Sequence, residues 1–160
     1  MRRRFFLTAT AITFSTGTSA RIALATPSQP IPLEVWKDPN CGCCNDWIAH
    51  MEQHGFTAKV HDVGNAAVRA QLGLPKEFAS CHTALVNGYL LEGHIPATDV
   101  QKLLTTKPKA LGLVVPGMPI GSPGMDGPQY MGRKDAYDVL LVTRNTIGQG
   151  VGTRVFSHYR

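Results

Sequence analysis

The residues of this sequence with the most distinctive chemistry are four cysteines, three of which lie within four positions. They are Cys41, Cys43, Cys44 and Cys81, here called the cysteine cluster. Deprotonated thiols are soft ligands that select copper(I), zinc or iron–sulfur clusters over hard cations. Structural disulfides restrict the unfolded chain most when they close long loops, so the close spacing favours a ligand set. The sequence therefore predicts a site for a soft metal such as copper(I), with the cysteines close enough to share metals in a thiolate-bridged cluster.

Two other interpretations of the cysteine cluster stay open. Cys41 and Cys44 have the Cys-x-x-Cys spacing of a redox pair, which predicts a thiol–disulfide or copper oxidoreductase. In that case Cys43 and Cys81 are bystanders or a resolving pair. Alternatively, all four cysteines form structural disulfides, although the adjacent Cys43 and Cys44 cannot easily bridge one another. Zinc is the alternative metal for the binding site.

Further ligands are expected close to the cysteines. His82 follows Cys81 directly, but neighbouring side chains of an extended strand point to opposite faces. Ligation by both residues therefore requires an irregular backbone. Met118 and Met125 lie in a segment rich in proline and glycine, and their thioethers are suitable copper(I) ligands. Methionine more commonly fills gaps between packed elements, so these two residues are secondary candidates.

Hydrophobic periodicity predicts the elements that position these residues. Cys44, Trp47, Ile48 and Met51 recur at helical spacing and form one apolar stripe. The expected elements, in chain order, are a strand at 31–36, a helix at 43–54 with Asn40 as its N-cap, a strand at 56–61, a helical stripe at 63–70, a hairpin of 83–86 and 89–92 around Asn87-Gly88, and a helix that starts at Pro96 and ends before Pro108.

This order of elements, β-α-β-α-β-β-α, is that of the thioredoxin fold. A crossover helix makes the first two strands parallel, and the hairpin makes the last two antiparallel. In such a fold the N-terminus of the first helix forms a reactive edge, where the helix dipole favours a thiolate. The Cys41–Cys44 motif lies at this edge. Cys81 directly precedes the third strand, at the place of the thioredoxin cis-proline, so we expect it to face the motif.

Two additions follow the third helix. The segment Pro116–Gly127 holds too much proline and glycine for a helix or strand, which predicts a rigid loop laid over another part of the fold. Apolar runs at 139–142 and 151–156 predict a closing hairpin around Gly148-Gln149-Gly150. The fold class expected is therefore α/β, thioredoxin-like, with an added Pro/Gly/Met loop and a C-terminal β-hairpin. Residues 26–160 are expected to form a single metal-binding domain.

The first 25 residues are expected to be a signal peptide. Three arginines follow Met1, residues 5–20 are mildly apolar, and Ala23-Leu24-Ala25 matches a cleavage pattern. Arg3-Arg4-Phe5-Phe6-Leu7 resembles the twin-arginine export signal, and the general secretory route stays open. The apolar stretch is too short to span a membrane. We therefore expect a periplasmic protein whose mature chain has no membrane span.

The charge balance makes nucleic acid an unexpected partner. The chain has 16 basic and 11 acidic residues, but four of the basic residues precede the expected cleavage point. These are Arg2, Arg3, Arg4 and Arg21. The mature chain thus has nearly equal numbers of basic and acidic residues, and it lacks the basic stripe with interleaved aromatic residues that nucleic-acid binding requires.

Four motifs together resemble a known bacterial family. They are Val35–Cys44, Ser80–Thr83, Glu92–Ala97 and Met118–Met125. The chain resembles the CopG-type copper-resistance family, formerly catalogued as a domain of unknown function. The resemblance covers nearly all of the expected mature chain up to about Gly127. It implies a thioredoxin-like fold, metal binding by the cysteine cluster and a part in copper handling. Copper ions are the implied partner, together with other periplasmic copper-handling proteins.

Overall fold

The structure is a computed structural model that describes residues 29–145 and 150–160. The expected signal peptide and part of the turn at Gly148-Gln149-Gly150 lie outside the described residues. The strands are β1 (Ile31–Lys37), β2 (Phe56–His61), β3 (His82–Val86), β4 (Tyr89–Glu92), β5 (Gly112–Val114), β6 (Tyr137–Arg144) and β7 (Val151–Tyr159). The α-helices are α1 (Gly42–Gln53), α2 (Ala66–Gln71) and α3 (Ala97–Thr106).

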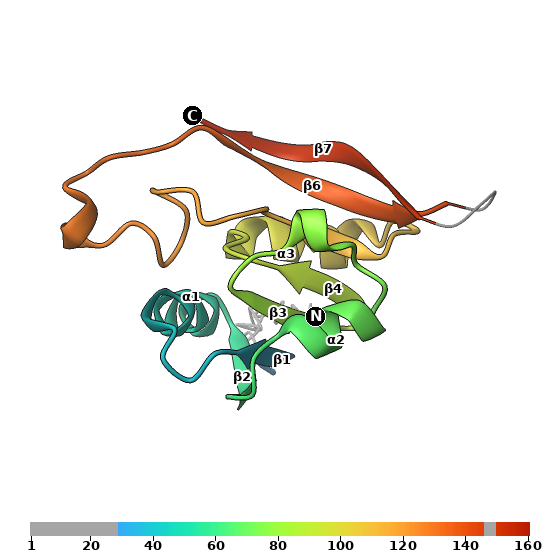
Figure 1. Cartoon of the computed structure of the whole chain (residues 1–160), viewed down its shortest axis with the longest axis horizontal. Helices are drawn as coiled ribbons and strands as arrows, with labels where there is room; N and C mark the ends of the chain where they lie inside the picture. Colours follow the sequence, from blue (N-terminus) through green and yellow to red (C-terminus); the bar gives the residue numbers. More distant parts are fainter. Residues whose placement is uncertain (1–28, 146–149) are drawn as a thin grey trace, which may run out of the picture.

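One mixed seven-stranded sheet organises the described residues, in the order β2-β1-β3-β4-β5-β6-β7 (Figure 1). β1 pairs in parallel with β2 and antiparallel with β3, and β3 pairs antiparallel with β4. These directions are the predicted ones. The β3–β4 turn has positive φ at both Asn87 and Gly88, which is the requirement of a tight two-residue hairpin turn.

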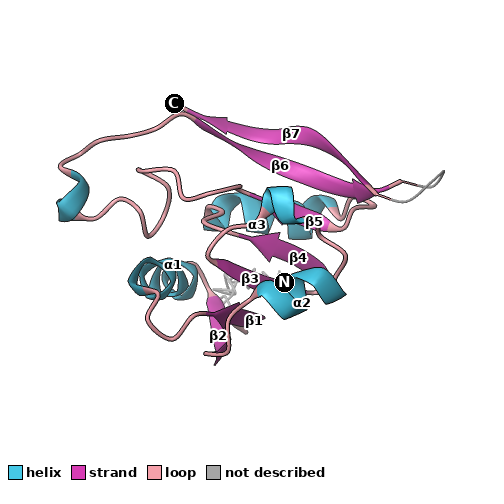
Figure 2. Ribbon diagram, viewed as in Figure 1, coloured by secondary structure: helices cyan, strands magenta, loops and turns pink. Residues whose placement is uncertain are grey.

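The main core lies between the sheet and the helices α1 and α3. The predicted stripe of α1 is buried, with Trp47 and Met51 fully enclosed against Val35 and Leu33 of β1. α3 contributes Val100 and Leu103 to the same core (the two helices are seen in Figure 2). Because the core holds the first turn of α1 against the sheet, the motif that begins this helix has a fixed position.

The predicted N-cap of the first helix is wrong. Cys41 is the N-cap residue of α1, and no side chain caps the helix. Asn40 instead lies in the preceding turn, where its backbone N–H donates to Oδ1 of Asp38 at 2.8 Å. The Asp38 side chain stabilises the turn in the way expected of an aspartate at this kind of position. The helix therefore starts directly at the cysteine motif.

The predicted second helical stripe does not pack in a core. α2 is only six residues long and has no buried residue, and Val63 is 79% exposed. The buried residue in this region is Leu74, which lies beyond the helix and packs in a smaller core with Leu90, Val114 and Val142. α2 must therefore be held on the domain by polar contacts.

The strand β5 was not predicted. It has three residues, too few to show alternation, and it joins the parallel β4 to the antiparallel β6. A Cβ atom at Gly112 would lie 1.7 Å from the backbone oxygen of Leu90, so this close pairing requires glycine. The C-terminal hairpin of β6 and β7 is confirmed and is longer than expected.

The segment from Pro116 to Gly127 contains neither helix nor strand, as predicted. It lies over the N-terminal turn of α1. A Cβ atom at Gly124 would come within 2.6 Å of the Cys43 carbonyl oxygen and 2.8 Å of the Trp47 backbone nitrogen. Gly124 also has a φ of +83°, which other residues rarely adopt. Within residues 29–145 and 150–160, no helix has the length and apolar character needed to cross a membrane.

Candidate metal centre

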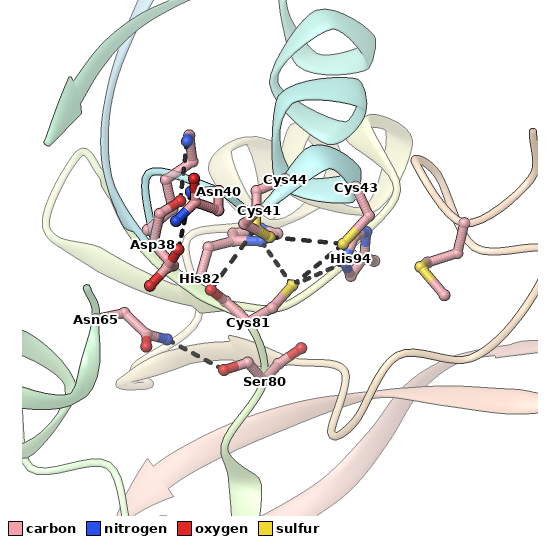
Figure 3. The surroundings of a disulfide bond; sticks show 12 residues. Asp38, Asn40, Cys41, Cys43, Cys44, Asn65, Ser80, Cys81, His82 and His94 are labelled. Carbon is pink, nitrogen blue, oxygen red and sulfur yellow. Dashed lines mark hydrogen bonds between the residues drawn. A yellow bond between two sulfur atoms is a disulfide. The ribbon is translucent and has the colours of Figure 1, made fainter. Parts of the chain in front are cut away.

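The cysteine motif occupies the start of α1 (Figure 3). Cys41 is the N-cap, and Cys43 and Cys44 lie in the first turn. This turn carries no acidic side chain, so nothing in it opposes the attraction between the helix dipole and a thiolate. Cys41 and Cys44 form a disulfide bond, whereas Cys43 is a free thiol of intermediate exposure.

Cys81 meets the motif from the other side, as predicted. Its Sγ atom lies 3.9 Å from Sγ of Cys43, which in turn is 3.6 Å from Sγ of Cys41. Sγ of Cys44 lies 3.7 Å from the carbonyl oxygen of Cys81. The four sulfur atoms all lie within 4.8 Å of one another. Two segments far apart in the sequence therefore bring all four cysteines to one point.

Two histidines extend this site. Nε2 of His94 is 3.0 Å from Sγ of Cys81, and Nδ1 of His82 is 3.5 Å from the same sulfur. Their ligating atoms and the Cys81 sulfur lie within 4.8 Å of one another and form a second possible ligand group. Cys81 lies just before the first residue of β3, so the strict alternation of the strand does not separate it from His82.

His94 is a candidate ligand that the sequence analysis did not name. It belongs to the motif Glu92–Ala97, which resembles the copper-resistance family. That resemblance could have identified His94 as a candidate ligand alongside His82. Its Nδ1 atom lies 2.8 Å from the carbonyl oxygen of Pro123, an acceptor. Nδ1 must therefore carry the proton, which leaves the lone pair of Nε2 facing Cys81.

Burial sets the protonation of these groups. It is the largest cause that lowers the pKa of His94 and holds the pKa of His82 well below its ordinary value. Both imidazoles are therefore neutral, as metal ligation requires. Burial, followed by the neighbouring Cys43, raises the pKa of the Cys81 thiol to about 12. Cys81 is thus a protonated thiol until a metal displaces its proton.

His82 has an unpartnered nitrogen. The residue is fully buried, and its Nε2 atom is the one buried side-chain nitrogen or oxygen of the described chain that lacks a hydrogen-bond partner. The Trp47 ring lies 4.2 Å from the His82 ring, measured between centroids. A buried polar atom without a partner costs free energy, and such atoms in a native structure commonly mark a site for an ion or water.

The structure separates the two predicted methionines. Met125 is buried, and its sulfur accepts a hydrogen bond from the Tyr130 hydroxyl at 3.2 Å. Met118 is 52% exposed. The loop that carries both contacts the site through the Pro123 carbonyl, which holds His94, and through Gly124, which packs on α1.

Two other histidines, His50 in α1 and His54 at its C-cap, make hydrogen bonds with the backbone. Nε2 of His50 accepts a hydrogen bond from the backbone N–H of Ala97 at 3.1 Å, at the start of α3. Nδ1 of His54 lies 2.7 Å from the carbonyl oxygen of His50. The first bond joins α1 to α3, and the second lies at the C-terminal end of α1.

The disulfide decides which chemistry each state of the site can perform. A disulfide sulfur is not a thiolate, so all four cysteines can bind metal together only after two-electron reduction of the Cys41–Cys44 bond. The pairing is the one that the redox interpretation specified. The alternative in which all four cysteines form disulfides is wrong, because Cys43 and Cys81 are free. In the disulfide form, the thiols of Cys43 and Cys81 and the two histidines remain available as candidate metal ligands.

The fold and the site define a mixed α/β protein with a sulfur-rich centre, and comparison with known proteins places it in a family. The family described as "Protein of unknown function, DUF411" matches residues 78–125. A solved structure described as "Copper resistance protein copG- Form 2" has 41% sequence identity and a TM-score of 0.71, covering 82% of this chain and 100% of that chain. A second solved structure, described as "Copper resistance protein copG- Form 1", has 42% sequence identity and a TM-score of 0.70, covering 82% of this chain and 98% of that chain.

The chain therefore belongs to the CopG-type copper-resistance family. Membership in that family and the cluster of four cysteines point to copper handling. A comparison with curated protein sequences gives no match.

Proposed function

We propose that this protein is an exported copper(I)-binding protein that holds its metal through the cysteine cluster. The observation that carries the proposal is the 3.9 Å approach of Cys43 and Cys81, which lie 38 positions apart in the chain. A thiolate set of this kind selects copper(I) over hard cations. Copper is the cargo of the protein, and reduction of the disulfide Cys41–Cys44 makes the full donor set available.

The spacing of the sulfurs supports a thiolate-bridged cluster. The Cys43 sulfur lies close to the sulfurs of both Cys41 and Cys81, at 3.6 Å and 3.9 Å. A thiolate has more than one lone pair and can bind two copper(I) ions at once. Cysteines held this close together share metals more easily than they surround one ion tetrahedrally. Cys43 is therefore the proposed bridge.

His94 and His82 are proposed as additional ligands. Both are neutral and contact Cys81, and His94 presents a fixed lone pair. Met125 and Met118 are proposed as weaker contributors. Met125 is the better placed of the two by its burial, although it would have to exchange its hydrogen bond with Tyr130 for a metal bond.

A thioredoxin-like fold is part of the proposal. The strand order β2-β1-β3-β4, with one parallel and two antiparallel pairings, supports it. So does the position of the motif at the N-terminus of the helix that follows β1. In this account β5 and the C-terminal hairpin extend the sheet, and the segment 116–127 covers the site.

The proposed location is the periplasm. It requires that residues 1–25 act as a signal peptide and that residues 26–160 form the mature protein, a single domain. Fractionation of cells that express the full chain tests both parts. A shorter protein in the periplasm is expected, and substitution of Arg3 and Arg4 by lysine blocks export if the twin-arginine route is used. Export of that double variant would point to the general secretory route. Retention of the unshortened wild-type chain in the cytoplasm would contradict the proposal.

An anaerobic copper(I) titration of the reduced protein against a chromophoric chelator tests the binding function. Wild type is compared with the Cys→Ser variant of each member of the cluster. Tight binding that falls in all four variants is expected, most strongly for Cys43 and Cys81. Weak binding by wild type, or binding that survives loss of both Cys43 and Cys81, would contradict the proposal. Metal analysis of protein isolated from the periplasm separates copper from zinc.

A second function, oxidoreductase, is supported by the disulfide itself. Cys43 lies 3.6 Å from Cys41, which is within reach for thiol–disulfide exchange. Oxidation of the reduced Cys41–Cys44 dithiol to the disulfide releases two electrons and two protons, and reduction of two copper(II) ions to copper(I) takes up the two electrons. Catalytic turnover of copper(II) or of a disulfide substrate, with an added thiol as the electron donor, that is lost in both Cys41→Ser and Cys44→Ser would establish this role. Tight copper(I) binding without turnover would exclude it.

A further inference from the structure

The carboxylate of Glu92, at the end of β4, lies at the centre of a buried polar network. Its side chain is fully buried. One oxygen accepts hydrogen bonds from the Ser80 backbone N–H at 2.8 Å and from Arg69 Nη1 at 3.2 Å. The same oxygen accepts from Asn65 Nδ2 at 3.4 Å, and the other accepts from the Thr83 hydroxyl at 2.5 Å. Glu92 therefore ties α2 and the chain before β3 to one point.

The contacts converge on Ser80, the residue directly before Cys81. Its N–H donates to Glu92, and its carbonyl oxygen accepts from Asn65 Nδ2 at 3.2 Å (Figure 3). Its hydroxyl donates to the carbonyl oxygen of Gly117. Every polar group of Ser80 is thus engaged, and Glu92 and Asn65 hold both sides of its backbone.

Cys81 depends on this support, because it lies outside the sheet. β3 starts at His82, so no strand pairing fixes the backbone of Cys81. Gly93 makes the close approach possible, since a Cβ atom there would lie 2.6 Å from the Ser80 hydroxyl oxygen and 2.4 Å from the carbonyl oxygen of Val115. The segment before Cys81 therefore rests directly on the end of β4.

A buried ion pair is a poor source of stability. Bringing Glu92 and Arg69 out of water costs free energy that their attraction only partly returns, and apolar side chains of similar volume often stabilise as well or better. Their contribution is a set of hydrogen bonds to the backbone next to a proposed ligand: Arg69 donates to Glu92, and Glu92 accepts from the N–H of Ser80, which precedes Cys81. Partners that orient ligands in this way typically change metal affinity by about tenfold to about a hundredfold.

We propose that Glu92 is a positioning residue for the Cys81 thiolate, with Asn65 as its partner on the other side of Ser80. This inference rests on the proposed copper-binding function and names residues outside the ligand set that control it. Glu92 acts by fixing the backbone from which Cys81 reaches Cys43 and His94.

Two substitutions at Glu92 separate positioning from stability. Glu92→Gln keeps an oxygen to accept from Ser80 and can donate to Thr83, whereas Glu92→Leu keeps the volume and removes every acceptor. The matched control is Asp99→Leu. Asp99 is a second buried carboxylate, 4% exposed, which accepts from the Tyr159 and Ser157 hydroxyls and belongs to the contact between α3 and the C-terminal hairpin.

The first readout is copper(I) affinity of the reduced variants, measured on samples whose thermal unfolding shows that they are folded. Glu92→Leu is expected to weaken binding by about tenfold or more, and Glu92→Gln to stay within about threefold of wild type. Asp99→Leu is expected to lower thermal stability while copper(I) affinity stays within about threefold. Equal affinities for Glu92→Leu and wild type, or an equal loss in Asp99→Leu, would overturn the proposal.

The second readout needs no metal and so remains valid if the copper proposal fails. With the other three cysteines replaced by serine, the alkylation rate of Cys81 is compared with and without Glu92→Leu. A severalfold change in rate is expected, and an unchanged rate overturns the positioning role. If Glu92→Leu does not fold, Asn65→Ala takes its place, because Asn65 is only half-buried and its loss frees the Ser80 carbonyl. An unchanged rate in Asn65→Ala is then the contradicting result.

Discussion

Nε2 of His94 lies 3.0 Å from Sγ of Cys81, and the same ring is held from behind by the carbonyl oxygen of Pro123. The loop 116–127 thereby fixes the tautomer of a histidine that faces the cysteine cluster. This is the arrangement in which an outer hydrogen bond orients a metal-binding imidazole.

The first prediction concerns that histidine. His94→Ala is expected to weaken copper(I) binding by at least about tenfold, because it removes a neutral nitrogen ligand and leaves the Pro123 carbonyl without its donor. Chelator competition measures the change. His158→Ala is the control, since His158 lies on β7 and is half exposed. Equal affinities for the two variants would exclude His94 from the site.

The second prediction concerns the disulfide between Cys41 and Cys44. The reduced protein is expected to bind more copper(I) ions than the disulfide form, because oxidation removes two of four thiolates. Copper content after anaerobic loading and desalting measures the difference. The double variant with serine at both positions should bind like the disulfide form in either redox state. An identical copper content for reduced and oxidised wild type would contradict this prediction.

The third prediction concerns the proton on Cys81. Because its pKa is raised to about 12, the thiol is protonated throughout the neutral range, and copper(I) must displace that proton. Affinity is therefore expected to increase with pH, by about tenfold per pH unit for each proton released. Chelator competition between about pH 6 and about pH 8 measures the slope. Cys81→Ser should lower this slope by about one proton, and an unchanged slope would show that Cys81 is not a ligand.

The fourth prediction concerns the stability of the metal-free protein in acid. His82 is buried with its pKa well below the ordinary 6.5, so the unfolded chain binds a proton that the folded chain excludes. Its contribution to stability is complete above about pH 6.5 and is lost as the pH falls below that value, by up to about 1.4 kcal/mol per pH unit. Urea unfolding on both sides of this pH measures the effect. His82→Gln should flatten it, and the same acid sensitivity in that variant would assign the loss to other groups.

The fifth prediction concerns the cover of the site. Gly124→Ala and Gly132→Ala both place a side chain at positive φ, at a cost of about 1 to 2 kcal/mol. Only Gly124 has neighbours, the Cys43 carbonyl oxygen and the Trp47 backbone nitrogen, whereas a Cβ atom at Gly132 meets nothing within 4 Å. Gly124→Ala is therefore expected to destabilise more and to increase the alkylation rate of Cys43. Equal behaviour of the two variants would mean that the loop does not cover the cysteine.

Elements with a strong local signal were predictable from the sequence. The stripe of α1, the two alternating strands and the Asn87-Gly88 hairpin all follow from periodicity or from a turn that demands positive φ, and the structure confirms them. The convergence of Cys81 on the motif was predictable as well, because the order of elements places the two segments at one edge of the sheet.

The remainder depends on contacts that a single sequence does not reveal. β5 is a strand only because β4 and β6 pair with its three residues. The apolar stripe at 63–70 suggested a packed helix, but α2 is held by polar contacts such as that of Arg69 with Glu92. His94 lies in one of the four family-like motifs, but its contacts with Cys81 and Pro123 depend on how three distant segments fold together.

The central claim, that thiolates of the cysteine cluster hold copper(I), is tested most directly by X-ray absorption at the copper edge. The sample is the reduced protein loaded anaerobically with copper(I), with Cys43→Ser as the comparison. The account predicts a copper(I) edge, a first shell dominated by sulfur, and copper–copper scattering that is lost when the bridging Cys43 is replaced. A first shell of nitrogen and oxygen alone would contradict it.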